Sequence, residues 1–71
     1  MTQCQRVMQF LKDNKTITQM QALRELSVMR LPSRINDLRK AGNLILTERE
    51  HGMNQFGDQT SYARYRLIKE A

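Results

Sequence analysis

Apolar residues recur every three or four positions along the first half of the chain, a spacing that lines one face of an α-helix. The pattern predicts three helices, over residues 2–14, 18–27 and 30–41. Pro32 fits the third helix only in its first turn, where its missing N–H costs nothing. Gly42 follows that helix at the position where a left-handed glycine commonly ends a helix.

Two of the predicted helices begin with the same capping signature. Thr2 is followed three residues later by Gln5, and Thr18 is followed in the same way by Gln21. In such a capping box the threonine side chain accepts from a backbone N–H one turn on, and the glutamine side chain accepts from the threonine N–H. The sequence therefore predicts helix starts near residues 2 and 18.

Each predicted helix has one apolar face, which we expect to be buried. These faces consist of Cys4, Val7, Met8 and Leu11, of Met20, Leu23 and Leu26, and of Leu31, Ile35 and Leu38. Cys4 is the only cysteine, so no disulfide can form within the chain, and its position is typical of a small core residue.

The spacing changes after Gly42, where apolar and polar residues begin to alternate as they do in strands. Two strands are predicted, over residues 44–50 and 61–68, with residues 51–60 as a polar loop between them. The β-prone segment 16–18 could add a short third strand near residue 17. The expected fold class is α+β, with three helices followed by a two-stranded antiparallel hairpin.

Length and charge narrow the function classes. The 71 residues suffice for one domain, residues 1–71, and are too few for a deep catalytic cleft. The formal net charge of +5 and the pI near 10.0 favour a polyanionic partner, with nucleic acid ahead of an acidic membrane surface.

Several kinds of site are not indicated by the sequence. One cysteine and one histidine cannot supply a structural zinc site, and we see neither a nucleophile–base pair nor a glycine-rich phosphate loop. We therefore expect no enzyme, metal, cofactor or small-molecule ligand. No segment resembles a signal peptide or approaches the ~20 apolar residues of a membrane span, so a cytoplasmic protein is expected.

The third helix concentrates the positive charge. Residues 28–42 hold four basic residues against one acid, whereas residues 43–60 hold one basic residue against three acids. On a helical wheel, Ser33, Asn36 and Lys40 point away from the core, and arginines lie on both flanks. Such a face suits the major groove, where serine and asparagine reach base edges and arginine or lysine reaches phosphates or guanine.

The segments ITQMQALRELSVMRLPSRINDLRKAGNLILTE and ARYRL resemble the small helix-turn-helix proteins encoded by phages and prophages. In that family a helix led by Thr, with Ala-Leu-Arg-Glu-Leu, precedes a recognition helix of the pattern Arg-Leu-x-x-Arg-Ile-x-x-Leu-Arg. The resemblance implies a winged helix-turn-helix fold and double-stranded DNA binding, with residues 30–41 in the major groove. Arg30 and Arg34 match the arginines of the motif, so the resemblance implies that both contact DNA.

The resemblance and the helix face together give a set of candidate DNA-binding residues. The set is Arg30, Ser33, Arg34, Asn36, Asp37, Arg39, Lys40 and Arg64. A transcription regulator and an excisionase-like architectural factor in a bacterial host cell both fit this set. We expect a monomer in solution, because no helix is left over for a dimer interface.

A protein-interaction module is the alternative, for example a phage-encoded inhibitor of a host protein. Its support is the uncharged segment from Gly52 to Gly57, which contains Met53 and Phe56. Methionine and phenylalanine on an exposed loop can anchor an interface. Phe56 could equally fold back on the sheet, and the sequence leaves both arrangements open.

Overall fold

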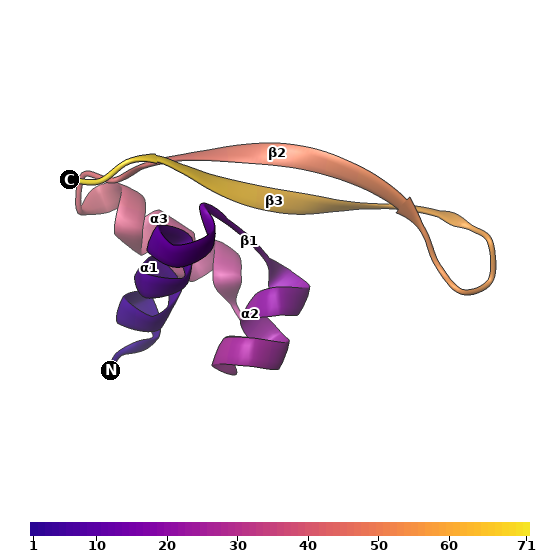
Figure 1. Cartoon of the computed structure of the whole chain (residues 1–71), viewed down its shortest axis with the longest axis horizontal. Helices are drawn as coiled ribbons and strands as arrows, with labels where there is room; N and C mark the ends of the chain where they lie inside the picture. Colours follow the sequence, from indigo (N-terminus) through magenta and orange to yellow (C-terminus); the bar gives the residue numbers. More distant parts are fainter.

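The computed structural model describes all 71 residues and contains three helices and three strands (Figure 1). In chain order they are α1 (Gln3–Asn14), β1 (Thr16–Thr18), α2 (Gln19–Leu26), α3 (Leu31–Lys40), β2 (Leu44–Met53) and β3 (Gln59–Lys69). The α+β fold class and the positions of the three helices are confirmed.

Both predicted capping boxes are present. The Thr2 hydroxyl accepts from the Gln5 N–H at 3.1 Å, and the Gln5 side chain accepts from the Thr2 N–H at 2.7 Å. Thr18 and Gln21 make the same pair of bonds at the start of α2. Each box satisfies two N–H groups that a helix start otherwise leaves without partners, so these residues decide where the two helices begin.

The third helix starts and ends differently. Pro32 lies in its first turn, as expected, and no side chain caps that end. At the other end Gly42 has a φ of 104°, a conformation that other residues rarely adopt, and its N–H donates to the Arg39 carbonyl at 3.0 Å. The chain can therefore turn sharply from α3 into β2.

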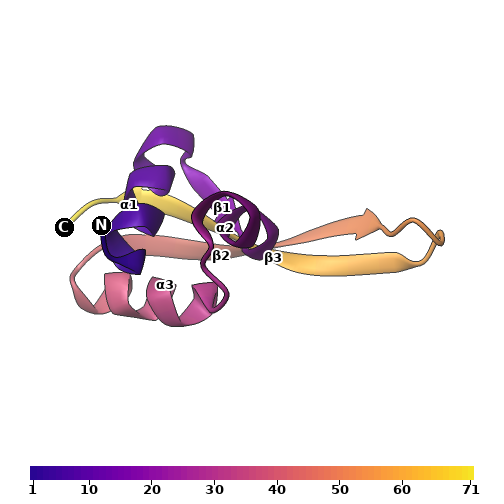
Figure 2. The same cartoon turned by 90° about the horizontal axis from the view of Figure 1, so that it is seen from below.

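The three strands form one antiparallel sheet in the order β1-β3-β2. The short strand expected near residue 17 is confirmed, because Ile17 lies opposite Tyr65 of β3. Tyr65 also lies opposite Thr47 of β2, so β3 joins the beginning of the chain to its last hairpin. All three helices lie against one face of this sheet (Figures 1 and 2).

The core lies between the helices and that sheet face. Its ten buried hydrophobic residues are Val7, Leu11, Ile17, Ala22, Val28, Leu31, Ile35, Leu38, Ile45 and Tyr65. Cys4 is partly buried and packs against them, which agrees with its expected role as a small core residue.

The predicted buried face of α2 was wrong at two of its three residues. Met20 and Leu23 are 60% and 46% exposed, whereas Ala22 is completely buried and Leu26 is partly buried against the core. The inner stripe of this helix therefore starts from Gln19, which is half-buried. The small Ala22 side chain lets α2 pack closely against the core. The polar Gln19 occupies an inner position for which the periodicity predicted an apolar residue.

Gln19 fastens the turn between α2 and α3. Its side-chain amide donates to the Val28 carbonyl at 3.0 Å, and its oxygen accepts from the Leu31 N–H, also at 3.0 Å. These two backbone groups belong to a tight turn and have little access to water, since Val28 and Leu31 are both fully buried. The glutamine therefore sets how α3 leaves the turn.

The hairpin is longer than predicted. Strands β2 and β3 stay paired as far as Met53 and Gln59, so half of the predicted loop over residues 51–60 belongs to the ladder. Both faces of this outer part are exposed to solvent, so the pairing there produces no alternation of apolar and polar residues. The hairpin, called the wing below, projects past the helices and gives the molecule extents of 40 × 22 × 20 Å (Figures 1 and 2).

We expect Gln19→Ala to lower the free energy of unfolding by about 1–3 kcal/mol, because it leaves a buried donor and a buried acceptor without partners. Gln9→Ala is the matched control: the Gln9 amide bonds only to Asp13 on an exposed helix face, so a change within about 0.5 kcal/mol is expected. Urea denaturation followed by circular dichroism measures both, and equal stabilities for the two variants would contradict the role given to Gln19.

Candidate functional site

The exposed face of α3 is polar along its middle. Asn36 and Lys40 are exposed, Ser33 is half-buried, and Arg30 is exposed at the residue before the helix. The side chains of these four residues take part in no hydrogen bond or ion pair within the protein. They are therefore available to an external ligand without the loss of an internal contact.

Arg34 is not free in the same way. Its Nη1 donates to Gln3 Oε1 at 3.2 Å, and its Nε lies 3.2 Å from Asp37 Oδ2 in an ion pair that lacks hydrogen-bond geometry. The Arg34 side chain is only 31% exposed. Cys4 Sγ also lies 3.9 Å from the Asp37 carboxylate, so Arg34 and Asp37 connect the start of α1 to α3.

Arg39 points toward the wing. Its Nε and Nη2 both donate to the Ile45 carbonyl, at 3.0 and 2.8 Å, and Nη2 also donates to Thr47 Oγ1 at 2.8 Å. No carboxylate neutralises this guanidinium, so its positive charge is held by neutral acceptors at the root of β2.

Arg64 lies apart from the other sequence-predicted residues. It alternates with the buried Tyr65 and therefore belongs to the face of the sheet opposite the helices. There it pairs with Glu50 at 3.0 Å and donates to Thr16 at 3.2 Å. The predicted site residues thus divide into seven on or beside α3 and one on the opposite sheet face.

The acids of β2 are engaged as well. Arg66 pairs with Glu48 at 2.8 Å, next to the pair between Arg64 and Glu50. Glu48 and Glu50 therefore neutralise the two arginines of β3, and Asp58 is the one acid among residues 43–60 whose carboxylate has no basic partner.

Sequence reasoning missed Arg49 and His51. Both alternate with Ile45 and Thr47, which places them on the sheet face against which α3 packs. Both are exposed, and neither side chain has a partner within the protein. The signal was present in the alternation of Ile45, Thr47 and Arg49, which puts a positive charge on the inner face of the wing.

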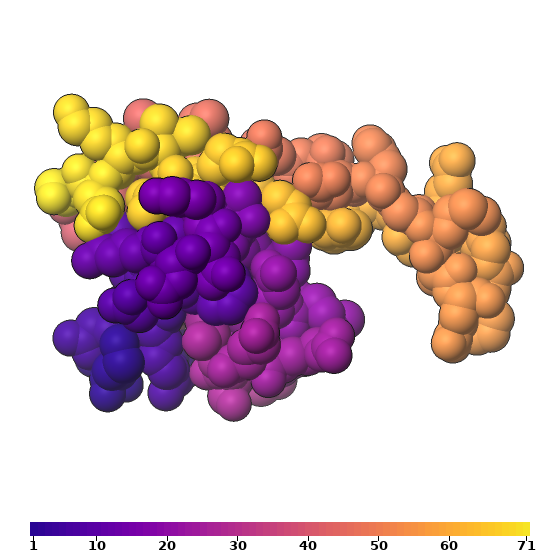
Figure 3. All heavy atoms as spheres, in the orientation of Figure 1, coloured from indigo at the N-terminus to yellow at the C-terminus, as the bar shows by residue number.

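The wing ends in a short, ordered turn. Asn54 Oδ1 accepts from the N–H groups of Phe56 and Asp58 at 2.9 and 3.0 Å, and Gly57 has a φ of 82°. Met53 and Phe56 are 70% and 78% exposed at this tip. Phe56 therefore does not fold back on the sheet, and the tip stands clear of the helices (Figure 3).

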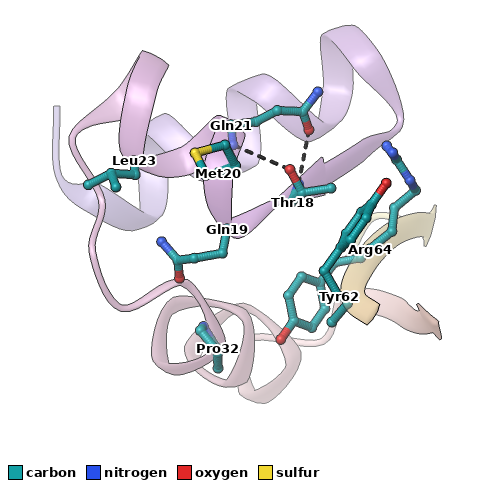
Figure 4. Close-up of a pocket in the computed structure, with 10 residues that line it drawn as sticks. Thr18, Gln19, Met20, Gln21, Leu23, Pro32, Tyr62 and Arg64 are labelled. Carbon is teal, nitrogen blue, oxygen red and sulfur yellow. Dashed lines mark hydrogen bonds between the residues drawn. The ribbon is translucent and has the colours of Figure 1, made fainter. Parts of the chain in front are cut away.

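A groove of about 660 Å³ lies between the first turn of α2, the start of α3 and β3 (Figure 4). Its hydrophobic lining consists of Met20, Leu23, Tyr62, Ala63 and Tyr65, and Pro32 and Arg64 line it as well. The structure contains no group of three His, Cys, Asp or Glu residues that could hold a metal ion, and none of its helices has the length and apolarity needed to span a membrane.

Comparison with known proteins identifies a family. The profile of a family described as a winged helix-turn-helix domain matches residues 2–70, nearly the whole chain. No curated protein and no solved structure matches the chain significantly.

Because Arg34 connects two helices, Arg34→Ala should lower the free energy of unfolding by about 0.5–1.5 kcal/mol. Arg30→Ala removes the same kind of side chain from an exposed position without partners and should change stability by less than about 0.5 kcal/mol. Thermal unfolding of the two variants makes the comparison. Equal stabilities would mean that the contacts of Arg34 contribute nothing to the fold.

Proposed function

Since the chain belongs to the winged helix-turn-helix domain family, we propose that it binds double-stranded DNA, with α3 in the major groove and the wing against the neighbouring backbone. The observation that carries the proposal is the exposed face of α3, where Arg30, Ser33, Asn36 and Lys40 are free of internal contacts. The net charge of +5 adds a general attraction to the phosphate backbone.

The free residues of α3 divide by chemistry. Arg30 and Lys40 stand near opposite ends of the helix and suit phosphates on the two sides of the groove. Ser33 and Asn36 lie between them and suit base edges, since asparagine can bond adenine through two hydrogen bonds. Asp37 fits a cytosine amino group, and Arg34 fits a guanine through the donors that its internal contacts leave unused.

The wing contact in this proposal comes from Arg49 rather than Arg64. Arg49 lies on the sheet face against which α3 packs, and its charge is unpaired. Arg64 lies on the other face and is held by Glu50. His51 follows Arg49 on the same face, where its ring can donate a hydrogen bond to a phosphate.

The proposed biological setting comes from the resemblance between residues 17–48 and the proteins of phages and prophages. We propose a transcription regulator or an excisionase-like architectural factor that acts in the cytoplasm of a bacterial host. Both roles use the same helix in the same groove, and both are compatible with a protein that is a monomer before it meets DNA.

A second function is favoured by the tip of the wing. Met53 and Phe56 are both largely exposed there, beside a turn that Asn54 closes with two hydrogen bonds. An exposed aromatic residue on a rigid turn is a common anchor for a protein partner. The chain would then be a protein-interaction module, with a host or phage protein as its partner.

Affinity for random-sequence duplex should fall steeply with salt, with each neutralised phosphate adding about −0.9 to the slope of log affinity against log salt. Arg30→Ala and Arg49→Ala should each make the slope shallower by about 0.9, because each removes an unpaired charge from the proposed contact surface. Fluorescence anisotropy at four salt concentrations measures the slopes.

The matched controls are Arg64→Gln and Arg66→Gln. Each removes one charge from the opposite face of the sheet, where the arginine is already paired with a glutamate. Their slopes should equal that of the unmodified protein. A slope near zero for the unmodified protein would refute DNA binding, and equal losses in all four variants would refute the contact surface.

Phe56→Ala separates the two functions. The variant should unfold within about 0.5 kcal/mol of the unmodified protein, because Phe56 buries little surface. If the protein acts on DNA through α3, duplex affinity should stay within about threefold, since a side chain outside the contact contributes little to binding. A protein partner that is lost with Phe56→Ala and kept with Arg30→Ala would favour the interaction module instead.

A further inference from the structure

We infer that Arg39 is a positioning residue, which holds the wing at a fixed angle to α3 and so sets the distance between their two contacts with DNA. The inference deepens the proposed function and rests on it for the DNA part. Arg39 is then no longer a candidate DNA contact, and it affects DNA binding only through β2, to which it is bonded.

The first observation is the number and direction of its bonds. Three short contacts use two nitrogens of one guanidinium, at 3.0, 2.8 and 2.8 Å, and all of them end on β2. The planar, rigid guanidinium donates from Nε and Nη2 to the Ile45 carbonyl, and Nη2 donates to the Thr47 hydroxyl oxygen as well. A side chain reaching for phosphate would point away from the protein instead.

The second observation is the state of the strand that receives these bonds. Strand β2 pairs only with β3, so its other edge has no strand beside it. The pairing is irregular between Leu44 and Ile45, which is where the wing begins. Arg39 therefore bonds Ile45, directly after the irregularity at which the wing begins.

The connection from α3 to β2 is otherwise short. Ala41, Gly42 and Asn43 make up the link, and Asn43 bonds back to the Leu38 carbonyl at 2.9 Å. The bonds of Arg39 to Ile45 and Thr47 are a second connection between the end of the helix and the start of the strand, beside the covalent link. Two connections restrict rotation of the wing more than the covalent link alone does.

A small rotation at this root has a large effect at the tip. Met53 lies six residues beyond Thr47, which is about 20 Å along a strand. A rotation of about 10° at the root would move the tip by roughly 3.5 Å over this length. Arg49 and His51, the proposed phosphate contacts, lie two and four residues beyond Thr47, where the same rotation moves the chain by roughly 1 and 2 Å. Such displacements exceed the spread of hydrogen-bond distances, so a loosened wing would weaken its phosphate contacts.

Two variants test the inference in different ways. Arg39→Lys keeps the positive charge and loses the paired donors, whereas Thr47→Val keeps Arg39 and every charge in the protein and loses one acceptor. Both should remain folded, because Arg39 and Thr47 are exposed and lie outside the core. Circular dichroism verifies this before any other measurement.

The first measurement uses the free protein and needs no DNA. Residual dipolar couplings of backbone amides give the orientation of residues 47–63 relative to the helices. In the unmodified protein the wing should have a single orientation. In Arg39→Lys we expect the couplings of the wing to shrink relative to those of α3, and in Thr47→Val to shrink by a smaller amount.

The second measurement is affinity for duplex DNA. Arg39→Lys should bind about tenfold more weakly, and Thr47→Val about threefold more weakly, in keeping with the size of charged and single hydrogen bonds. A direct phosphate contact by Arg39 predicts instead that both variants bind almost as tightly as the unmodified protein, since lysine keeps the charge and Thr47 would not take part.

The outcomes separate cleanly. If the residual dipolar couplings of the wing are unchanged in both variants, the inference is overturned, whatever the affinities are. If the couplings shrink but the affinity for duplex DNA is unchanged, the proposed link between the position of the wing and DNA binding is overturned. If the unmodified protein fails to bind duplex, the proposed function is refuted, and the couplings of the free protein still decide whether Arg39 positions the wing.

Discussion

The pairing of β3 with a strand on each side is the interaction on which the rest of the structure depends. Tyr65 lies opposite both Ile17 and Thr47, and it is the aromatic residue of the core. A chain this short buries only ten hydrophobic side chains, so three helices without a sheet would have little to pack against. By joining the link after α1 to the final hairpin, β3 closes the core and also provides the base of the wing.

The same pairing explains why the wing can project. Near Tyr65 the inner face of the sheet is covered by helices, and the side chains there are buried. The ion pairs of Glu48 and Glu50 with Arg66 and Arg64 link the two strands near the root, and beyond Glu50 the ladder continues on strand pairing alone. The outer part of the wing therefore needs few apolar residues, and the apolar residues of this short chain can be used in the core.

Much of the fold could be predicted because its signals are local. The capping boxes at Thr2 and Thr18, the glycine at residue 42 and the change from helical to alternating spacing each involve residues within a few positions of one another. The errors arise where contacts with residues far away in the sequence decide which side chains are buried. Met20 and Leu23 were predicted to be buried and are exposed. The neighbouring sequence does not show that Gln19 bonds to the turn before α3 and takes the inner position.

In the candidate site, too, the features with local signals could be predicted, and those set by distant contacts could not. Sequence placed the basic residues on α3 correctly, but it could not distinguish a free guanidinium from an engaged one. Arg30 has no partner, Arg34 is tied to Gln3 and Asp37, and Arg39 is bound to the wing. On the helical wheel the three look equivalent, because their partners lie up to 31 residues away in the chain.

The free edge of β2 has a consequence for how copies of the protein behave when they are crowded together. An exposed strand edge offers unpaired N–H and C=O groups to any other strand, and long open edges promote aggregation. Here the Ile45 carbonyl already accepts from Arg39, and Glu48, Arg49 and Glu50 place three charges in succession along the same strand. A second copy approaching that edge would have to displace a guanidinium and pack beside three charged side chains, so the open strand is a poor template for fibre growth.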